Sequence, residues 1–217
     1  MQTKMLDFYK NCQQCPRNCK IDRTSPKVKG FCRESSELKI AFAGLHFGEE
    51  PLITAKGGSG TIFFTGCTLR CKFCQNYQIS QEGLGGEVSS EEFSKICMRL
   101  QNAGAENINL VTGSHHIPKI AEFLREARKN GVTIPFCWNS SAYEKTEMLE
   151  LLKGLVTIWL PDLKTLDKSL SRSLFEAEDY PEVATTAIKW MILNNKIEIE
   201  DKNGVEKMLD RKSTRLN

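Results

Sequence analysis

TGCTLRCKFCQNY, residues 65–77, places three cysteines in one short loop: Cys67, Cys71 and Cys74. Three thiolates can hold three irons of a cubic 4Fe–4S cluster and leave the fourth iron open for a further ligand. The loop directly follows the apolar run IFF, residues 62–64, which predicts a short buried strand. A metal site is therefore expected at the carboxyl end of a strand, where α/β enzymes place their chemistry.

A zinc knuckle is the alternative interpretation of this loop. Clusters of cysteines also bind zinc when a fourth ligand comes from elsewhere in the chain. The position of three closely spaced thiols directly after a strand favours the open iron–sulfur cluster over zinc.

The composition is that of an ordinary soluble globular protein, with 217 residues of which 40% are hydrophobic and 26% charged. This length favours one main domain with a small appendage. The formal net charge is only +3, from 30 basic and 27 acidic residues. Such a small excess gives no electrostatic argument for a nucleic acid or an anionic membrane as a partner, and we expect neither.

The chain has nine cysteines, which are many for a protein that binds no metal. Its first residues lack the apolar core of a signal peptide, and no stretch approaches the length of a transmembrane helix. A cytoplasmic protein with metal-bound thiolates is therefore a simpler expectation than a secreted protein with disulfides. Cys97, on a helical apolar stripe, and Cys137, inside a predicted strand, are expected to be buried as small hydrophobic residues.

Helix and strand patterns alternate after the cysteine loop. A capping box at residues 89–92 predicts the start of a helix that Gly104 ends. The further predicted strands are residues 107–112, 133–138 and 156–160, and the further predicted helices begin near Pro118, Glu147 and Pro181. This order predicts an α/β fold with parallel strands and right-handed crossovers, forming part of a βα barrel. An open doubly wound sheet is the alternative, but no glycine-rich dinucleotide motif follows any strand.

A second group of cysteines precedes the barrel, in a stretch with little apolar material. Four thiolates can close a tetrahedral zinc site or bind a second cluster, and bound metal would account for the folding of this segment. Zinc is the favoured interpretation, a second cluster the next, and free thiols the last. The four candidate ligands are Cys12, Cys15, Cys19 and Cys32.

Three segments are expected along the chain. Residues 1–36 form a Cys-rich extension, residues 37–209 an incomplete barrel, and residues 210–217 a disordered tail. The tail is polar and resembles the translation of a sequencing adapter, which predicts that the chain is a fragment of a longer protein. A barrel of four strand–helix units cannot close, which agrees with that expectation.

The spacing C-x3-C-x2-C, with Phe73 before the last cysteine, resembles the signature of the radical S-adenosylmethionine (radical SAM) enzymes. The chain from Cys12 to about Gly204 resembles the subgroup named for its similarity to pyruvate formate-lyase activating enzymes. The matching pieces are CPR (15–17), GEEP (48–51), GSGTIFF (58–64), CQNY (74–77), NINLVT (107–112) and LPDLK (160–164). The fold implied by the resemblance is a partial radical SAM barrel.

The resemblance implies a 4Fe–4S cluster on Cys67, Cys71 and Cys74 that binds SAM through its amino and carboxylate groups. Reductive cleavage would give methionine and a 5′-deoxyadenosyl radical, and an activase uses that radical on a backbone glycine of a partner enzyme. The implied partners are a protein or peptide substrate, such as a glycyl-radical enzyme, and an electron donor such as flavodoxin or ferredoxin. Peptide modification of another type and a non-catalytic zinc-binding interaction module are the alternatives.

Further cofactor contacts are expected at strand ends. In similar enzymes a Gly-Gly-Glu turn after the second strand holds the SAM amino group, and here Gly113 and Ser114 occupy that place without the acid. The residues expected to hold the SAM carboxylate and ribose, or else to solvate strand ends, are Asn139, Ser140, Asp162 and Lys164. Phe73 is expected near the adenine or packed under the cluster. His115 and His116 point apart as adjacent residues, so a loop or substrate-facing role is favoured over ligation of one ion.

Overall fold

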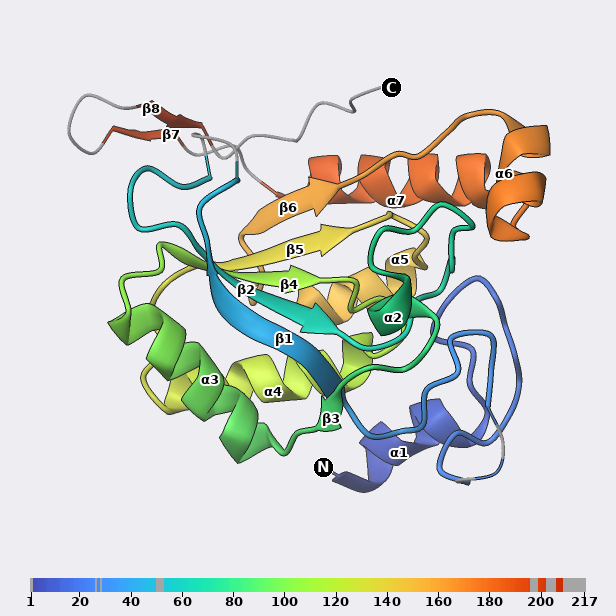
Figure 1. Cartoon of the computed structure of the whole chain (residues 1–217), viewed down its shortest axis with the longest axis horizontal. Coiled ribbons are helices and arrows are strands. Elements are labelled where there is room, and N and C mark those ends of the chain that lie inside the picture. The colour runs from blue at the N-terminus through green and yellow to red at the C-terminus, as the bar shows by residue number, and fades with distance from the viewer. Residues whose placement is uncertain are drawn as a thin grey trace.

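The computed structural model describes residues 2–25, 27, 29–49, 53–195, 199–201 and 206–208. In this part of the chain six strands form one mixed sheet in the order β3-β1-β2-β4-β5-β6, which does not close into a barrel (Figure 1). The strands are β1 (Lys39–His46), β2 (Ser59–Phe64), β3 (Gly86–Glu87), β4 (Asn107–Val111), β5 (Phe136–Ser140) and β6 (Ile158–Pro161). The mixed α/β architecture agrees with the partial βα fold predicted from the alternating helix and strand patterns.

The predicted parallel strands are confirmed, because β2, β4, β5 and β6 pair in parallel. β1 pairs antiparallel to β2 and was not predicted. Residues 40–45 (IAFAGL) form a continuous apolar run, which is typical of a strand, and sequence analysis passed over it.

β5 begins three residues later than the pattern predicts, at Phe136 instead of Thr133. The backbone of residues 133 and 134 forms hydrogen bonds with side chains instead of with a neighbouring strand. Gln101 Oε1 accepts from Thr133 N at 2.8 Å, and the Arg128 guanidinium donates to Ile134 O at 2.8 Å. Pro135 also has no backbone donor for a sheet.

The helices are α1 (Gln2–Lys10), α2 (Tyr77–Ser80), α3 (Ser90–Asn102), α4 (Ile117–Lys129), α5 (Thr146–Leu149), α6 (Lys168–Phe175) and α7 (Tyr180–Asn194). A 3₁₀ turn, Glu150–Leu152, extends α5. The capping box at α3 is confirmed, since Ser89 Oγ accepts from Glu92 N at 3.2 Å and Glu92 Oε2 accepts from Ser89 N at 2.8 Å. Gly104, with φ of +93°, follows the helix end as expected.

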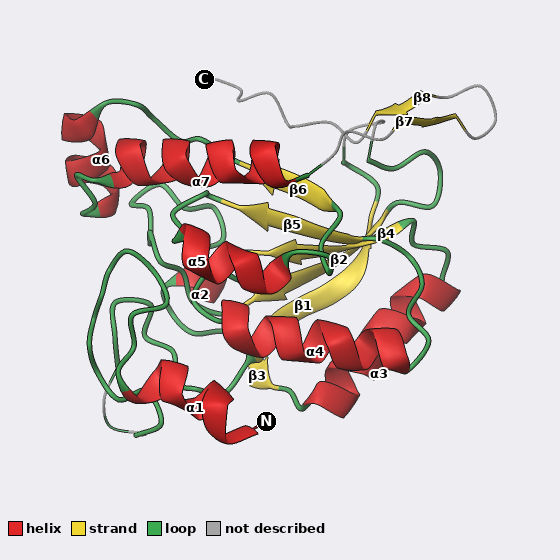
Figure 2. Cartoon of the chain, turned by 180° about the vertical axis from the view of Figure 1, so that it is seen from behind, coloured by secondary structure: helices red, strands yellow, loops and turns green. Residues whose placement is uncertain are grey.

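One face of the sheet is covered by α3, α4, α5 and α7, as Figure 2 shows from behind. The main core lies between these helices and the sheet, with fully buried side chains such as Phe93, Leu110 and Leu124. Each such side chain stabilises the fold by about 1.5–3 kcal/mol. Cys97 belongs to this core, and Cys137 lies in a second cluster with Ile53, Ile158 and Leu160. The prediction that both cysteines are buried is confirmed.

The last described strands, β7 (Ile199–Asp201) and β8 (Glu206–Met208), form a separate antiparallel pair. Residues 196–198 and 202–205 and the expected tail at 210–217 lie outside the described residues. No helix in the described part of the chain combines the length and the apolar character that a membrane crossing requires.

Candidate cofactor site

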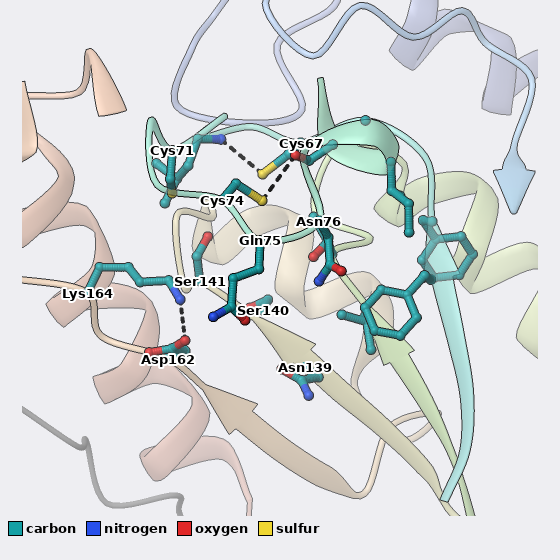
Figure 3. Close-up of a pocket in the computed structure, with 18 of the residues that line it drawn as sticks. Cys67, Cys71, Cys74, Gln75, Asn76, Asn139, Ser140, Ser141, Asp162 and Lys164 are labelled. Atoms are coloured by element: carbon teal, nitrogen blue, oxygen red, sulfur yellow. Dashed lines mark hydrogen bonds and ion pairs between the residues drawn. The ribbon is translucent and has the colours of Figure 1, made fainter. Parts of the chain in front are cut away.

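A cavity of about 420 Å³ lies at the carboxyl ends of the parallel strands (Figure 3). The cysteine loop forms one side of it, and the ends of β5 and β6 form the facing side. The predicted site residues that line it are Cys67, Cys71, Cys74, Phe73, Asn139, Ser140, Asp162 and Lys164. The structure therefore brings together three thiols and four polar side chains that are up to 97 positions apart in the chain, 67 to 164.

The three thiols lie in a tight loop between β2 and α2. Leu69 N donates to Cys67 Sγ at 3.4 Å, Cys74 N donates to Cys71 O at 3.1 Å, and Cys74 Sγ contacts Ser80 Oγ at 3.2 Å. Burial raises the pKa of Cys67, and it raises the pKa of Cys71 to about 12. Such thiols stay protonated at neutral pH unless a metal replaces the proton.

Gly66 lets the chain enter this loop. Its φ is +84°, and a Cβ added there would lie 2.5 Å from Glu34 Cγ. At the other end of the loop, Gln81 Nε2 donates to Cys71 O at 2.9 Å. The backbone that carries the thiols is thus fixed from both sides.

Arg17 of the N-terminal extension contacts the cysteine loop and stabilises its backbone. Its Nε donates to Thr68 O at 2.8 Å, and its terminal nitrogens donate to Phe175 O and Glu176 O at the end of α6. The guanidinium also lies 3.6 Å from the centre of the Phe31 ring. Sequence analysis used Arg17 only as part of the CPR match and did not foresee this contact.

The polar side chains opposite the thiols sit at the ends of neighbouring strands. Asp162 N donates to Ser140 O at 2.8 Å, which keeps the ends of β5 and β6 together. The Lys164 ammonium pairs with the Asp162 carboxylate and lies close enough to Cys67 and Cys71 to favour their ionised forms. Among the described residues the cavity therefore offers a ligand one ammonium, one carboxylate, several hydroxyls and the three side-chain amides of Gln75, Asn76 and Asn139.

Phe73 belongs to the cysteine loop, is half exposed and faces α6. Its ring meets that of Phe175 edge to face, with 5.9 Å between the centroids, and it also lines the cavity. One side of the ring thus packs on the protein while the cavity lies beside it.

Gly113 and Ser114 do not line this cavity, although Val111 and Thr112 do. Thr112 has φ of +62° and turns the chain away. Ser114 Oγ then donates to Glu144 Oε1 at 2.6 Å, and a Cβ at Gly113 would lie 2.6 Å from Ile120 and Trp138 atoms. A contact of these two residues with SAM stays a prediction that the cavity does not support.

Glu144 is a buried carboxylate that sequence analysis missed. It accepts from Ser114 Oγ at 2.6 Å, Trp138 Nε1 at 2.8 Å and Ser140 Oγ at 3.0 Å. Burial raises the pKa of this carboxyl group. Because Ser140 lines the cavity, its hydrogen bond to Glu144 holds this part of the cavity wall in place. An acid four residues after a strand end gives no sequence signal for such a role.

His115 and His116 lie in the turn between β4 and α4, as the expected loop role requires. The alternative substrate-facing role is wrong, because both side chains are buried, each with 1% exposure. His115 Nε2 donates to Thr65 O at 2.6 Å. His116 Nε2 accepts from Arg23 at 3.0 Å, so its Nδ1 donates to Tyr9 OH at 3.1 Å. The pair joins the N-terminal extension to the end of β2 and does not reach the cavity.

The unfolding free energy is expected to fall as the pH drops from about 6.5 to about 3, because His115 is buried in its neutral form. Burial lowers its pKa to about 3. Between these values the unfolded chain binds the proton and the folded chain does not, so His115 costs about 1.4 kcal/mol of stability per pH unit on acidification. The full contribution is present above about pH 6.5.

Denaturant titrations of the wild type and of His115→Gln at several pH values measure this slope. Glutamine keeps a donor for Thr65 O but does not titrate. The variant should show a shallower loss of stability over the same pH range. Equal slopes for both proteins would contradict a neutral, buried His115.

The three thiols of the loop fit the cysteine ligands of a 4Fe–4S cluster with one open iron, and the cavity beside them leaves space for a further ligand. In the described part of the chain no three His, Cys, Asp or Glu side chains already surround a site for a single metal ion. A cysteine loop at the ends of parallel strands is the arrangement expected of an iron–sulfur enzyme with a βα fold.

The sequence model of the Radical SAM superfamily matches residues 61–193, so the chain belongs to this superfamily. Its enzymes generally use a 4Fe–4S cluster and SAM. A protein of Methanocaldococcus jannaschii described as uncharacterized is 33% identical over 184 residues, which cover 80% of this chain and 51% of the relative. The chain thus spans about half the length of this relative.

Proposed function

We propose that this chain binds a 4Fe–4S cluster through Cys67, Cys71 and Cys74 and cleaves SAM reductively. The observation that carries the proposal is the cavity of about 420 Å³ that separates these thiols from the polar ends of β5 and β6. Its volume lies in the range of about 300–1,000 Å³ typical of small-ligand sites. When bound, the reduced cluster supplies the electron that splits SAM into methionine and a 5′-deoxyadenosyl radical.

The residues around the cavity have separate roles in this proposal. The Lys164 ammonium attracts the carboxylate of the methionine part, and Asn139 and Ser140 offer hydrogen bonds to the carboxylate or the ribose. Asp162 holds Lys164 in place through their ion pair. Phe73 offers its ring to the adenine. The apolar wall residues Phe63, Leu69 and Val111 exclude water beside the reacting groups.

The substrate in this proposal is a protein or peptide, and the reaction is activation of a glycyl-radical enzyme. The support is the resemblance to the activase-like subgroup over the CPR, CQNY and LPDLK segments. A flavodoxin or ferredoxin is the proposed electron donor, since the cleavage requires one electron for each SAM.

Product analysis tests the proposal. Anaerobically reconstituted chain, mixed with dithionite and SAM, should form 5′-deoxyadenosine and methionine in equal amounts. Adding a candidate glycyl-radical enzyme should produce a protein radical in the electron paramagnetic resonance spectrum. If SAM is cleaved but none of the candidate enzymes gains a radical, the result would support peptide modification of another type. Colourless protein with zinc at the loop and no cleavage would reject the proposal.

A further inference from the structure

We propose that Cys12, Cys15, Cys19 and Cys32 bind a second metal centre as four thiolates, with Arg23 as its buried counter-charge. The site lies in the N-terminal extension and does not depend on the function proposed for the barrel. Its chemistry is that of a thiophilic metal, either one Zn²⁺ or a second iron–sulfur cluster.

The four thiols gather in one segment without helix or strand. Cys12, Cys15 and Cys32 are buried, and Cys19 is half buried. Cys15 lies close enough to Cys12, Cys19 and Cys32 to interact electrostatically with each of them. Hydrogen bonds between Cys12 N and Ile21 O at 2.9 Å, and between Lys20 N and Cys12 O at 2.9 Å, fold the segment back on itself.

Backbone and side-chain donors already point at the sulfur atoms. Phe31 N lies 3.5 Å from Cys19 Sγ, and Arg23 Nη1 lies 3.6 Å from Cys12 Sγ. Gly30 also approaches Cys19 closely, because a Cβ there would lie 3.1 Å from its Sγ. N–H groups directed at sulfur stabilise thiolates more than neutral thiols.

Arg23 supplies the second, independent observation, because its guanidinium is buried with 1% exposure. The five N–H groups donate to the carbonyls of Glu34, Ser35 and His115, to His116 Nε2 and to Cys12 Sγ. None of these partners is a carboxylate, and the described residues contain no ion pair to Arg23.

A buried charge without an opposite charge is costly by several kcal/mol. The thiols of Cys12 and Cys32 lie close enough to Arg23 to interact with it electrostatically, and Cys12 Sγ lies 3.6 Å from its Nη1. Thiolates at these two positions would supply the negative charge that faces the cation.

Metal binding would provide those thiolates. A Zn²⁺ ion bound by four cysteines displaces four thiol protons and leaves a site of net charge −2, and a 4Fe–4S cluster in its 2+ state on four thiolates has the same charge. Arg23 offsets one of these charges. Among the described residues no three His, Cys, Asp or Glu side chains converge on one point. The four thiols would therefore have to move toward a single ion as it binds.

The centre would also organise the extension for its contact with the cofactor site. Arg17 lies between Cys15 and Cys19 in sequence and donates to Thr68 O in the Cys67–Cys74 loop. Fixing Cys15 and Cys19 on a metal fixes the backbone that presents Arg17. The second centre is thus placed to hold the first loop rigid.

The test uses the whole chain with Cys67→Ala, Cys71→Ala and Cys74→Ala combined, which removes the barrel ligands and leaves the extension intact. The triple variant should retain about one zinc per chain, or about four irons with an iron–sulfur absorbance. Either result supports the site and identifies the metal. A folded triple variant that takes up neither metal after anaerobic reconstitution would overturn the proposal.

Ligand and counter-charge variants are made in that background. Cys15→Ala and Cys32→Ala should lose the metal, whereas the matched control Cys97→Ala should keep it, since Cys97 lies in the α3 core. Arg23→Gln should weaken metal binding at least about tenfold in competition with a chromophoric chelator, and Arg23→Lys less. Unchanged affinity in folded Arg23→Gln would refute the counter-charge, whatever the behaviour of the cysteine variants.

Discussion

Replacing Cys71 by alanine is expected to remove iron from the Cys67–Cys74 loop and to abolish SAM cleavage. Cys71 is one of three thiols on the cavity wall, and no fourth cysteine lines that cavity among the described residues. Two thiolates hold a cubane poorly, because three of its irons need protein ligands. Even outer-shell partners of a metal typically cost about 10–100-fold when lost, so we expect a loss above about a hundredfold in 5′-deoxyadenosine formation.

Cys97→Ala is the matched control for this experiment. It makes the same substitution at another buried cysteine, but Cys97 packs in the α3 core away from the cavity. It should keep its iron and its activity apart from a modest loss of stability. A Cys71→Ala chain with the iron content and turnover of the wild type would contradict the assignment of the loop.

Replacing Glu144 by leucine is expected to lower the unfolding free energy by about 3–5 kcal/mol. The substitution leaves three buried donors, Ser114 Oγ, Trp138 Nε1 and Ser140 Oγ, without their acceptor. Each donor left unpaired costs about 1–3 kcal/mol.

Denaturant unfolding compares this variant with Glu147→Leu, which makes the same change at an exposed acid in α5. The control should change stability by less than about 1 kcal/mol. Equal effects of the two substitutions would show that the three hydrogen bonds to Glu144 do not stabilise the fold.

The parallel core of the fold was predictable because local patterns and tertiary structure agree there. The stripe of Phe93, Cys97 and Leu100 marks the buried face of α3, and the apolar segments that follow mark central strands. β1 was missed although residues 40–45 (IAFAGL) form an apolar run, and its antiparallel pairing to β2 breaks the strand–helix alternation on which the prediction relied. The late start of β5 depends on Gln101 and Arg128, whose contacts are visible only after α3 and α4 pack.

The site was predictable where it follows strand ends. Asn139, Ser140, Asp162 and Lys164 all reach the cavity because the carboxyl ends of parallel strands meet at one edge. The same rule fails for Gly113 and Ser114, because the backbone reverses at Thr112 before it reaches them.

Long-range contacts account for what sequence analysis missed. Arg17 donates to Thr68 O in the cysteine loop, 51 positions away, and Glu144 accepts from Ser114, 30 positions away, as well as from Trp138 and Ser140 in β5. The spacing of these residues along the sequence gives no indication that they are in contact. The burial of His115 and His116 likewise depends on Tyr9 and Arg23, which come from the other end of the chain.

Electron–nuclear double resonance on the reduced, anaerobic chain with isotope-labelled SAM tests the account most directly. If one iron on the Cys67, Cys71 and Cys74 site is open, labels in the amino nitrogen and the carboxylate of SAM should both couple to the cluster spin. A cluster that shows neither coupling at saturating SAM, or a spectrum that survives Cys71→Ala unchanged, would contradict it.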